Sequence, residues 1–396
     1  MAEILFKRII HPVGHGAFFT EQFVNPMTNE TLYNVVYDCG SLSSGMKNRI
    51  HHISDEIFKE RKINILFLSH FDDDHVNCVK HLVKQNYIDG ATIFIPLLKE
   101  ISFIGVLPYD NNYQYISNLN GYHNIKVINV KPENDDRTPE TLTNIEDIYD
   151  KVINSGTKIS TRILDYIWCY VPFNICIKDV LEEFRSRIED KGLDYDRLQD
   201  PEYVSIPAIQ KVIKGIYRNM GKKTDKNTII NFNSLQVLSF PVKTEYCKEY
   251  SRYSTCPYYF DDYYRWNRGY TKYKVDRELL YPGSCMYTGD TSANNTNVWK
   301  KLISIIDNYL KDDQKKNRKL VLFQLSHHGS VNSNDNSSLN ENRIYAAFAN
   351  YSIDGRSIFH NRLAIDYGLK RKPLLLVTEK ELTQFEEHWK LKKDDK

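Results

Sequence analysis

The chain has few cysteines, and they form no pattern typical of a zinc site or a disulfide framework. Its 396 residues include seven cysteines, and no two of them stand in a C-x-x-C pair. An odd and scattered set is typical of reduced thiols and argues against a disulfide-stapled secreted domain. We therefore expect a cytoplasmic protein with free thiols.

The chain also lacks a strong net charge and a long apolar run. The formal net charge is +2, so a basic surface for nucleic acid would have to be local. The most apolar late stretch, Tyr166 to Ile177, is too short for a bilayer and contains Pro172 and Asn174. The N-terminus, Met1 to Gly14, has no small-residue cleavage site. We expect neither a secretory signal nor a membrane partner.

Strand-like segments fall into two batches along the chain, in residues 1–99 and 227–396. With 41% hydrophobic residues, they can form one core of two sheets with helices on both outer faces. Residues 100–226 are polar and predict a helical insertion. Helical spacing recurs near 144–153, 178–191 and 204–219, and a closing helix is predicted near 379–390.

Residues 243–283 form a second unusual region, in which tyrosines alternate with lysines and arginines. Aromatic rings stack on bases while basic side chains meet phosphates, so this region could bind nucleic acid. The alternative, which the sequence slightly favours, is a hairpin or lid whose tyrosines pack on the core.

The most informative motif follows a short buried strand, Ile63 to Leu68. Four side chains that can bind metal follow in the spacing H-x-D-x-D-H: His70, Asp72, Asp74 and His75. Alternate residues of an extended segment point to one side, so the first three can converge, and the fourth joins as the chain bends into a helix. Imidazole and carboxylate ligands suit zinc, manganese or iron.

An ordinary polar helix N-terminus is the alternative explanation for this motif, because aspartates cap helices well. That explanation accounts for the carboxylates but not for two histidines beside a buried strand. We prefer the metal interpretation, except for Asp73, which we interpret as a cap or a solvated side chain.

Two later segments place polar residues at the ends of predicted strands. Asp290 follows an apolar strand at a glycine turn, where a simple turn aspartate is the alternative. His327 and His328 follow the predicted strand Leu320 to Leu325. Neighbours on an extended strand point in opposite directions, so at most one of them is expected to bind an ion if the strand continues. The other could donate a proton or hold a phosphate.

These motifs resemble the metallo-β-lactamase superfamily, whose hallmark is H-x-H-x-D-H after a buried strand. Asp72 stands where the second histidine is usual. The H-x-D-x-D-H variant looks like the branch that contains the hydrolase domain of bacterial DNA-uptake channel proteins and the phosphorylcholine esterases. The segment Tyr287 to Asp290 resembles the metal-bridging aspartate of that branch, and Ser326 to Ser330 resembles its H-H-G-S signature.

Weaker similarities extend this resemblance to roughly 1–100 and 230–378. Val13 to Gly16 with Asp38 to Gly40 resembles the opening strands, and Ser352 to His360 resembles a late stretch with a functional histidine. His15 and His360 are equally compatible with the site and with ordinary polar contacts, and Asp38 suits a supporting carboxylate.

The resemblance also has a gap. The family usually has a lone ligand histidine between the first motif and the bridging aspartate. The only histidines in that interval are His81 and His123, and neither is well placed. The second ion should therefore be weakly held, or His328 should complete its site.

The resemblance implies an α/β (α+β) fold, a four-layer αββα sandwich. The residue pattern adds the helical insertion 100–226 and the Tyr-rich insertion 243–283. It implies two divalent ions, zinc or manganese, with magnesium also compatible. The implied metal ligands are His70, Asp72, Asp74, His75, Asp290 and His327. The implied catalytic residues are Asp74, His328 and His360.

The predicted function is metal-dependent hydrolysis of a phosphodiester in nucleic acid, with water activated between ions bridged by Asp290. One alternative is a small-molecule phosphodiesterase acting on a cyclic nucleotide or a choline-type ester. A second alternative is a non-catalytic binding or regulatory protein that keeps the metal for stability. Residues 243–283 are the predicted nucleic-acid contact, and residues 100–226 could dock a protein partner.

Overall fold

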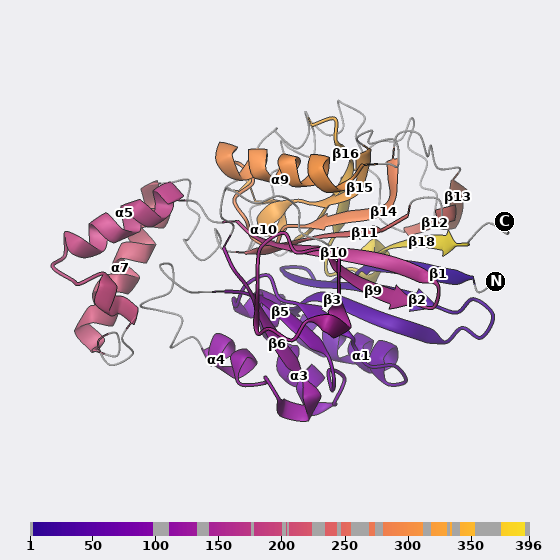
Figure 1. Cartoon of the computed structure of the whole chain (residues 1–396), viewed down its shortest axis with the longest axis horizontal. Coiled ribbons are helices and arrows are strands. Elements are labelled where there is room, and N and C mark those ends of the chain that lie inside the picture. The colour runs from indigo at the N-terminus through magenta and orange to yellow at the C-terminus, as the bar shows by residue number, and fades with distance from the viewer. Residues whose placement is uncertain are drawn as a thin grey trace.

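The protein is a mixed α/β structure built around two mixed β-sheets (Figure 1). The computed structural model describes residues 3–97, 111–132, 142–175, 178–199, 203, 206–223, 234–243, 247–254, 269–273, 280–311, 318–330, 333–334, 341–352 and 374–392. None of the helices in these ranges is both long and apolar enough to cross a membrane.

The first sheet begins at one edge with a hairpin from the Tyr-rich region and continues through strands from both ends of the chain. Its order is β13 (Gly269–Tyr273), β12 (Cys247–Ser254), β18 (Phe385–Leu391), β1 (Ile4–Ile10), β2 (Gly16–Val24), β3 (Thr31–Ser41), β4 (Ile65–Phe67), β5 (Thr92–Pro96), β6 (Lys126–Val130) and β8 (Val152–Ile153). The run from β3 to β8 is parallel, which places the carboxyl ends of these strands along one edge.

The second sheet combines a parallel half with an antiparallel half. Its order is β17 (Leu374–Val377), β16 (Ile344–Asn350), β15 (Lys319–Gln324), β14 (Leu280–Tyr287), β11 (Leu235–Pro241), β10 (Tyr166–Asn174), β9 (Ile159–Ile163) and β7 (Thr143–Asn144). The strands from β14 to β17 run parallel, so their carboxyl ends also share one edge.

The two sheets face each other across one large apolar core. Inward side chains from both sheets form this core, including Phe6, Phe19 and Phe67 from the first sheet and Trp168 from the second. In β1 the burial alternates along its first residues, as expected when one face of a strand packs against a core. Burying this many aromatic rings supplies the main driving force for the sandwich.

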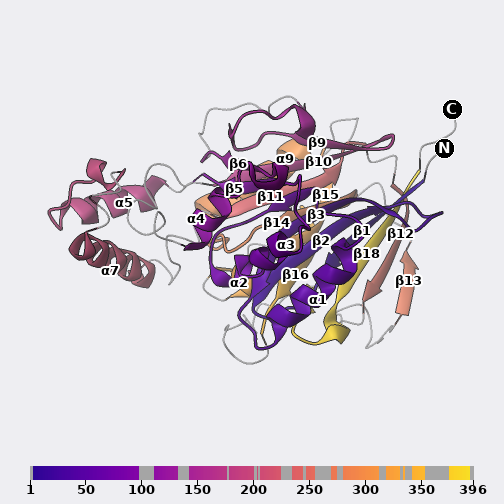
Figure 2. The same cartoon turned by 90° about the horizontal axis from the view of Figure 1, so that it is seen from below.

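Helices cover the outer face of each sheet (Figures 1 and 2). On the first sheet, α1 (Met46–Phe58), α2 (Asp73–Val76), α3 (Val79–Lys84) and α4 (Asn111–Ser117) share an apolar cluster with the strands. On the second sheet, α9 (Thr296–Tyr309) buries Val298, Leu302 and Ile306 at helical spacing. The layer order is therefore helix, sheet, sheet, helix.

Two helices form a separate unit at one side of the sandwich (Figure 1). α5 (Lys178–Glu189) and α7 (Pro207–Lys223) pack on each other through their own small cluster, which includes Phe184, Ile188 and Ile213. These helices match the helical spacing predicted near 178–191 and 204–219.

The predicted helical insertion over 100–226 is wrong for its middle part. Residues 126–174 contribute β6 and β8 to the first sheet and β7, β9 and β10 to the second. The helical spacing near 144–153 comes from two buried residues, Ile145 and Ile148. They begin and directly follow a single 3-10 turn, Ile145–Asp147. The apolar stretch at Tyr166 is a central strand paired with β9 and β11.

The closing helix predicted near 379–390 is also wrong, because this segment is the strand β18. Its residues Phe385, Glu387 and Trp389 alternate with more exposed neighbours, and the strand lies between β1 and β12. In this segment the buried side chains therefore recur at every second residue, as in a strand, and not at the spacing of a helix. The Tyr-rich region contributes the antiparallel pair β12 and β13 at the edge of the first sheet, and its remaining residues before β14 lie largely outside the described ranges.

Candidate metal centre

The H-x-D-x-D-H motif lies at the carboxyl end of β4, beside a hydrogen bond that joins the two sheets. The amide of Leu235, at the start of β11, donates to the carbonyl of Ser69 at 2.7 Å. The backbone stays extended through Asp72 (φ −66°, ψ 147°), and α2 begins at Asp73. This change from strand to helix brings His70, Asp74 and His75 to residues of the second sheet. Asp73 instead contacts Asn112.

The second sheet brings Asp290 and two histidines to the same edge. Asp290 follows β14, and His327 and His328 follow its parallel neighbour β15. Gly289 makes the close approach possible: its φ is +56°, and a Cβ there would lie 2.7 Å from the Cβ of Ser69. Only glycine fits this position without moving the motif away from Asp290.

His70, His75 and Asp290 form the first of two groups of ligand atoms. Asp290 Oδ1 lies 3.2 Å from His75 Nε2, and Asp290 Oδ2 lies 3.7 Å from His70 Nε2. All three side chains are buried. The Nε2 atoms of both histidines and Oδ1 of Asp290 have no hydrogen-bond partner among the described residues.

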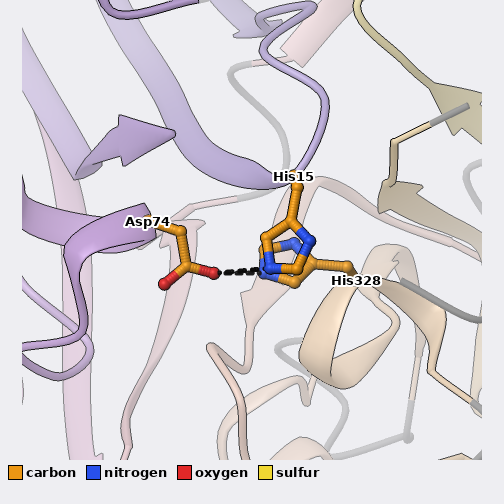
Figure 3. Close-up of side chains that lie close together, drawn as sticks. All are labelled: His15, Asp74 and His328. Carbon is orange, nitrogen blue, oxygen red and sulfur yellow. Dashed lines mark hydrogen bonds and ion pairs between the residues drawn. The ribbon is translucent and has the colours of Figure 1, made fainter. Parts of the chain in front are cut away.

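His15, Asp74 and His328 form the second group (Figure 3). The Nε2 atoms of His15 and His328 each lie 3.1 Å from Asp74 Oδ2. Figure 3 shows the two imidazoles approaching the carboxylate from the same side, although they come from opposite ends of the chain. Their ring centroids are 4.8 Å apart.

The two groups are neighbours and share partners. His75 Nε2 lies 3.9 Å from Asp74 Oδ2, and His328 Nε2 lies 3.9 Å from Asp290 Oδ1. We call these six residues the imidazole–carboxylate cluster: His15, His70, Asp74, His75, Asp290 and His328. Each of the two groups could hold a metal ion, and Asp290 contacts residues of both.

The cluster fits divalent metal ions by distance and by chemistry. Two nitrogen or oxygen ligands of one zinc ion, each about 2.0–2.2 Å from it, lie within about 4.4 Å of each other. The imidazole–carboxylate separations in both groups, 3.1 to 3.7 Å, satisfy this limit. Buried polar atoms that lack partners are costly, and several that face one another suggest a shared ligand that satisfies them.

A buried network underneath orients the cluster. Asp38 Oδ2 lies 2.8 Å from Nδ1 of His75 and accepts the hydroxyl of Ser69 at 2.7 Å. Ser69 Oγ also lies 2.9 Å from Nδ1 of His70. Both histidines are thus held through Nδ1, which leaves Nε2 directed at Asp290. Such support of a ligand histidine by a carboxylate is common in metal sites.

The carboxylates and histidines of the cluster shift one another's protonation. Burial lowers the pKa of His70 to about 4, and the adjacent His75 adds to this effect. Burial alone would also lower the pKa of His75, but the carboxylates of Asp290 and Asp38 outweigh it and raise that pKa. One imidazole is therefore favoured as neutral and its neighbour as charged when no metal is bound.

The two central carboxylates are held in their ionised form. Burial opposes the charge on Asp74, but His75, His15 and His328 outweigh it and keep its pKa well below the ordinary value. For Asp290 the charges on His327 and His75 likewise overcome burial and lower the pKa. The centre therefore presents two buried anions, which favours the binding of cations.

The two histidines after β15 are not on an extended strand. β15 ends at Gln324, and both His327 and His328 have left-handed backbones, with φ of 49° and 55°. Both rings therefore reach Asp290, with Nε2 atoms 3.6 Å and 3.9 Å from its carboxylate. The expectation of at most one ion ligand applied to a strand that continues, and this condition is not met because β15 ends at Gln324.

His327 and Asp72 line the open side of the centre. The side chain of His327 is 28% exposed and that of Asp72 is 44% exposed, whereas His70 and His328 are each 2% exposed. Asp72 Oδ2 lies 3.7 Å from His70 Nε2. The centre therefore has a buried floor and an accessible rim, as a substrate would require.

Three other histidines that the sequence analysis considered do not contribute to the described centre. His81 pairs with Asp55 and His123 with Asp89, so neither joins the centre, as expected. His360 lies outside the described residues. All six predicted metal ligands lie in this one region, and His328 of the predicted catalytic set joins them.

Sequence reasoning left His15 open between the site and an ordinary polar contact, and did not place it among the metal ligands. His15 precedes β2 in a glycine-rich loop, more than fifty residues before the motif, and a lone histidine there is an ambiguous signal. The flanking glycines, Gly14 and Gly16, were the one local hint that the loop packs tightly.

Comparison with known proteins adds no relative. No family model matches the chain, and no curated protein matches its sequence significantly.

Proposed function

We propose that this protein is a metal-dependent hydrolase of the metallo-β-lactamase type that cleaves phosphodiester bonds in nucleic acid. Two features support the proposal: the H-x-D-x-D-H and H-H-G-S motifs of the sequence, and two facing sheets covered by helices. The carboxyl ends of parallel strands are a common location for ligand sites in such sheets.

One observation carries the proposal. Buried nitrogen and oxygen atoms from segments far apart in the sequence converge at one point and lack hydrogen-bond partners among the described residues: His70 Nε2, His75 Nε2 and Asp290 Oδ1. Polar atoms in a protein interior are normally paired. Convergence of buried ligand atoms that form no hydrogen bond is the expected signature of a metal site.

Two divalent ions suit this cluster, one at His70, His75 and Asp290 and one at Asp74 and His328. When bound, such ions supply the Lewis acidity that activates water and neutralises charge on a phosphoryl group. Asp290 lies between the two positions and contacts residues of both. Asp38 and Ser69 keep His75 and His70 oriented while the substrate binds.

His327 is the imidazole that we assign to the substrate. Its ring is partly exposed, and its Nδ1 lies 3.1 Å from Ser333 Oγ, which fixes the ring while Nε2 stays near Asp290. From this rim it can hold the phosphoryl group or pass a proton to the leaving oxygen. His328 is buried against Asp74 and is better suited to ion binding.

The preference for a phosphodiester rests on the motif branch and on local positive charge. A cavity of about 190 Å³ lies beside Asp73 and is lined in part by Lys47, Lys80 and Asn77. Lysines beside the acidic motif suit a substrate with several phosphates, such as a polynucleotide. A small diester has a single phosphate and would gain less from two lysines.

The test is cleavage of labelled single-stranded and double-stranded DNA and RNA with manganese. We expect wild type to cut at least one polymer and Asp74→Asn to lose roughly 100-fold or more of this activity. His52→Ala is the matched control, because His52 is exposed and pairs only with Glu56 among the residues described. The His52→Ala variant should keep wild-type activity. A chelator should abolish cleavage by both proteins.

Salt dependence separates the polymer from small diesters. Binding of nucleic acid should weaken steeply as salt rises, whereas hydrolysis of a small diester should change little. If no polymer is cut but small diesters are, the nuclease assignment is lost and the hydrolase assignment stands. Metal binding without turnover of any ester would contradict both and favour a binding protein.

A further inference from the structure

We infer that His15 is a metal ligand of this centre, which together with Asp74 and His328 forms the second ion site. The inference rests on the proposed function, because it assumes that the cluster binds divalent ions. It adds a ligand from the loop before β2, a segment that neither H-x-D-x-D-H nor H-H-G-S contains.

Geometry is the first support. His15 Nε2 and His328 Nε2 both lie 3.1 Å from the same oxygen of Asp74 (Figure 3). Zinc with bonds of about 2.0–2.1 Å in a tetrahedral site separates its ligands by about 3.3 Å. Two edges of the triangle formed by these atoms thus nearly match a tetrahedral site, and all three atoms lie within 4.8 Å of one another.

The loop that carries His15 is fixed on both sides of the residue. The amide of His15 donates to Ser43 Oγ at 2.9 Å, and its carbonyl accepts the amide of Leu42 at 2.8 Å and the hydroxyl of Ser41 at 3.1 Å. A Cβ on Gly16 would lie 2.2 Å from the carbonyl oxygen of Gly40, so only glycine lets β2 approach β3 there. Rigid placement of this kind is what a ligand position needs.

The remaining contacts of the ring favour ligation over a structural role. His15 Nδ1 is buried and has no hydrogen-bond partner among the described residues, so Asp74 is the polar contact that positions the ring. A buried unpaired nitrogen costs about 1–3 kcal/mol, which makes histidine a poor choice for packing alone. A bond between Nε2 and an ion leaves Nδ1 without a partner but contributes binding free energy against that cost.

Equilibrium dialysis of the full chain against zinc, after chelator treatment, tests the inference. Wild type should bind two ions, and His15→Ala should bind one with wild-type affinity and the other at least tenfold more weakly. The matched control, His52→Ala, should bind two. Circular dichroism spectra of all three proteins should agree, which checks that the substitution leaves the fold intact.

Cobalt substitution distinguishes a ligand from a residue that only positions Asp74. If His15 binds the ion, the visible absorption of the cobalt protein should change in intensity and position in His15→Ala, because a nitrogen leaves the coordination sphere. Weaker zinc binding with an unchanged cobalt spectrum would assign His15 to hydrogen bonding with Asp74 and overturn ligation.

The outcomes also separate this inference from the proposed function. If wild type binds zinc and His15→Ala matches it in stoichiometry, affinity and spectrum, His15 is not a ligand and the hydrolase proposal is unaffected. If wild type binds no zinc, manganese or cobalt, the metal-dependent function fails and this inference fails with it.

Discussion

The molecule buries two clusters of charged side chains, and they differ in how their polar atoms are satisfied. The first, the arginine cluster, lies between the sheets and comprises Arg8, Glu21, Tyr170, Tyr287 and Glu387. Arg8 donates to Glu21 at 2.9 Å and to the carbonyl of Gly283 at 2.8 Å, and it also contacts Glu387. Both tyrosine hydroxyls donate to Glu21 at 2.8 Å.

The imidazole–carboxylate cluster is largely buried, but several of its atoms form no hydrogen bond, although they contact one another. In the arginine cluster one oxygen of Glu387 lacks a partner among the described residues, whereas in the other cluster four atoms do: His15 Nδ1, His70 Nε2, His75 Nε2 and Asp290 Oδ1. Three of these face a common point. Burial of charge is therefore not itself a sign of function; convergent unpaired atoms are the better sign.

The largest effect should come from breaking the arginine cluster. Arg8→Met would leave Glu21 and Glu387 buried without their cation, so the free energy of unfolding should fall by about 3–5 kcal/mol. Arg343→Met is the matched control, because Arg343 is 39% exposed and pairs with Asp307, and it should cost about 1 kcal/mol or less. Urea denaturation measures both, and equal losses would contradict the comparison.

The imidazole–carboxylate cluster should instead respond to metal. Zinc at about 100 times its dissociation constant should raise the free energy of unfolding by about 2.7 kcal/mol per occupied site. Asp290→Asn should remove most of this gain, because Asp290 lies between both ion positions. Thermal or urea unfolding with and without zinc gives the result, and an equal gain in the variant would show that zinc binds elsewhere.

A smaller effect should follow from removing support beneath the centre. Asp38→Asn would weaken the contact that holds His75 by Nδ1, so zinc affinity should fall about 10–100-fold while the fold is retained. Asp89→Asn is the control, because Asp89 pairs with Lys62 and His123 away from the centre. Titration calorimetry measures both affinities. Unchanged affinity in Asp38→Asn would mean that His75 does not need this support.

The sequence predicted the part of the centre that depends on local geometry. His70 to His75 are adjacent in the chain, and a strand that turns into a helix brings them together without help from the rest of the fold. Asp290 and the two histidines after β15 could be added because each follows a predicted strand. Their left-handed backbone could not be predicted, so the separate roles of His327 and His328 stayed open.

The features that were missed depend on contacts between distant segments. β10 looks like any short apolar run until it pairs with β11, about 70 residues later, and β18 looks helical until it pairs with β1. His15 reaches Asp74 because β2 and β3 pair closely at Gly16 and Gly40, which no local pattern records. Strand pairing, rather than residue type, carries this information.

The most direct test of the central claim is a crystal of the zinc-loaded protein measured at the zinc absorption edge. The account predicts two anomalous peaks in the imidazole–carboxylate cluster, one within bonding distance of His70, His75 and Asp290 and one within bonding distance of Asp74 and His328. No peak in this cluster, or zinc bound only at other surface residues, would contradict the claim that it is a metal centre.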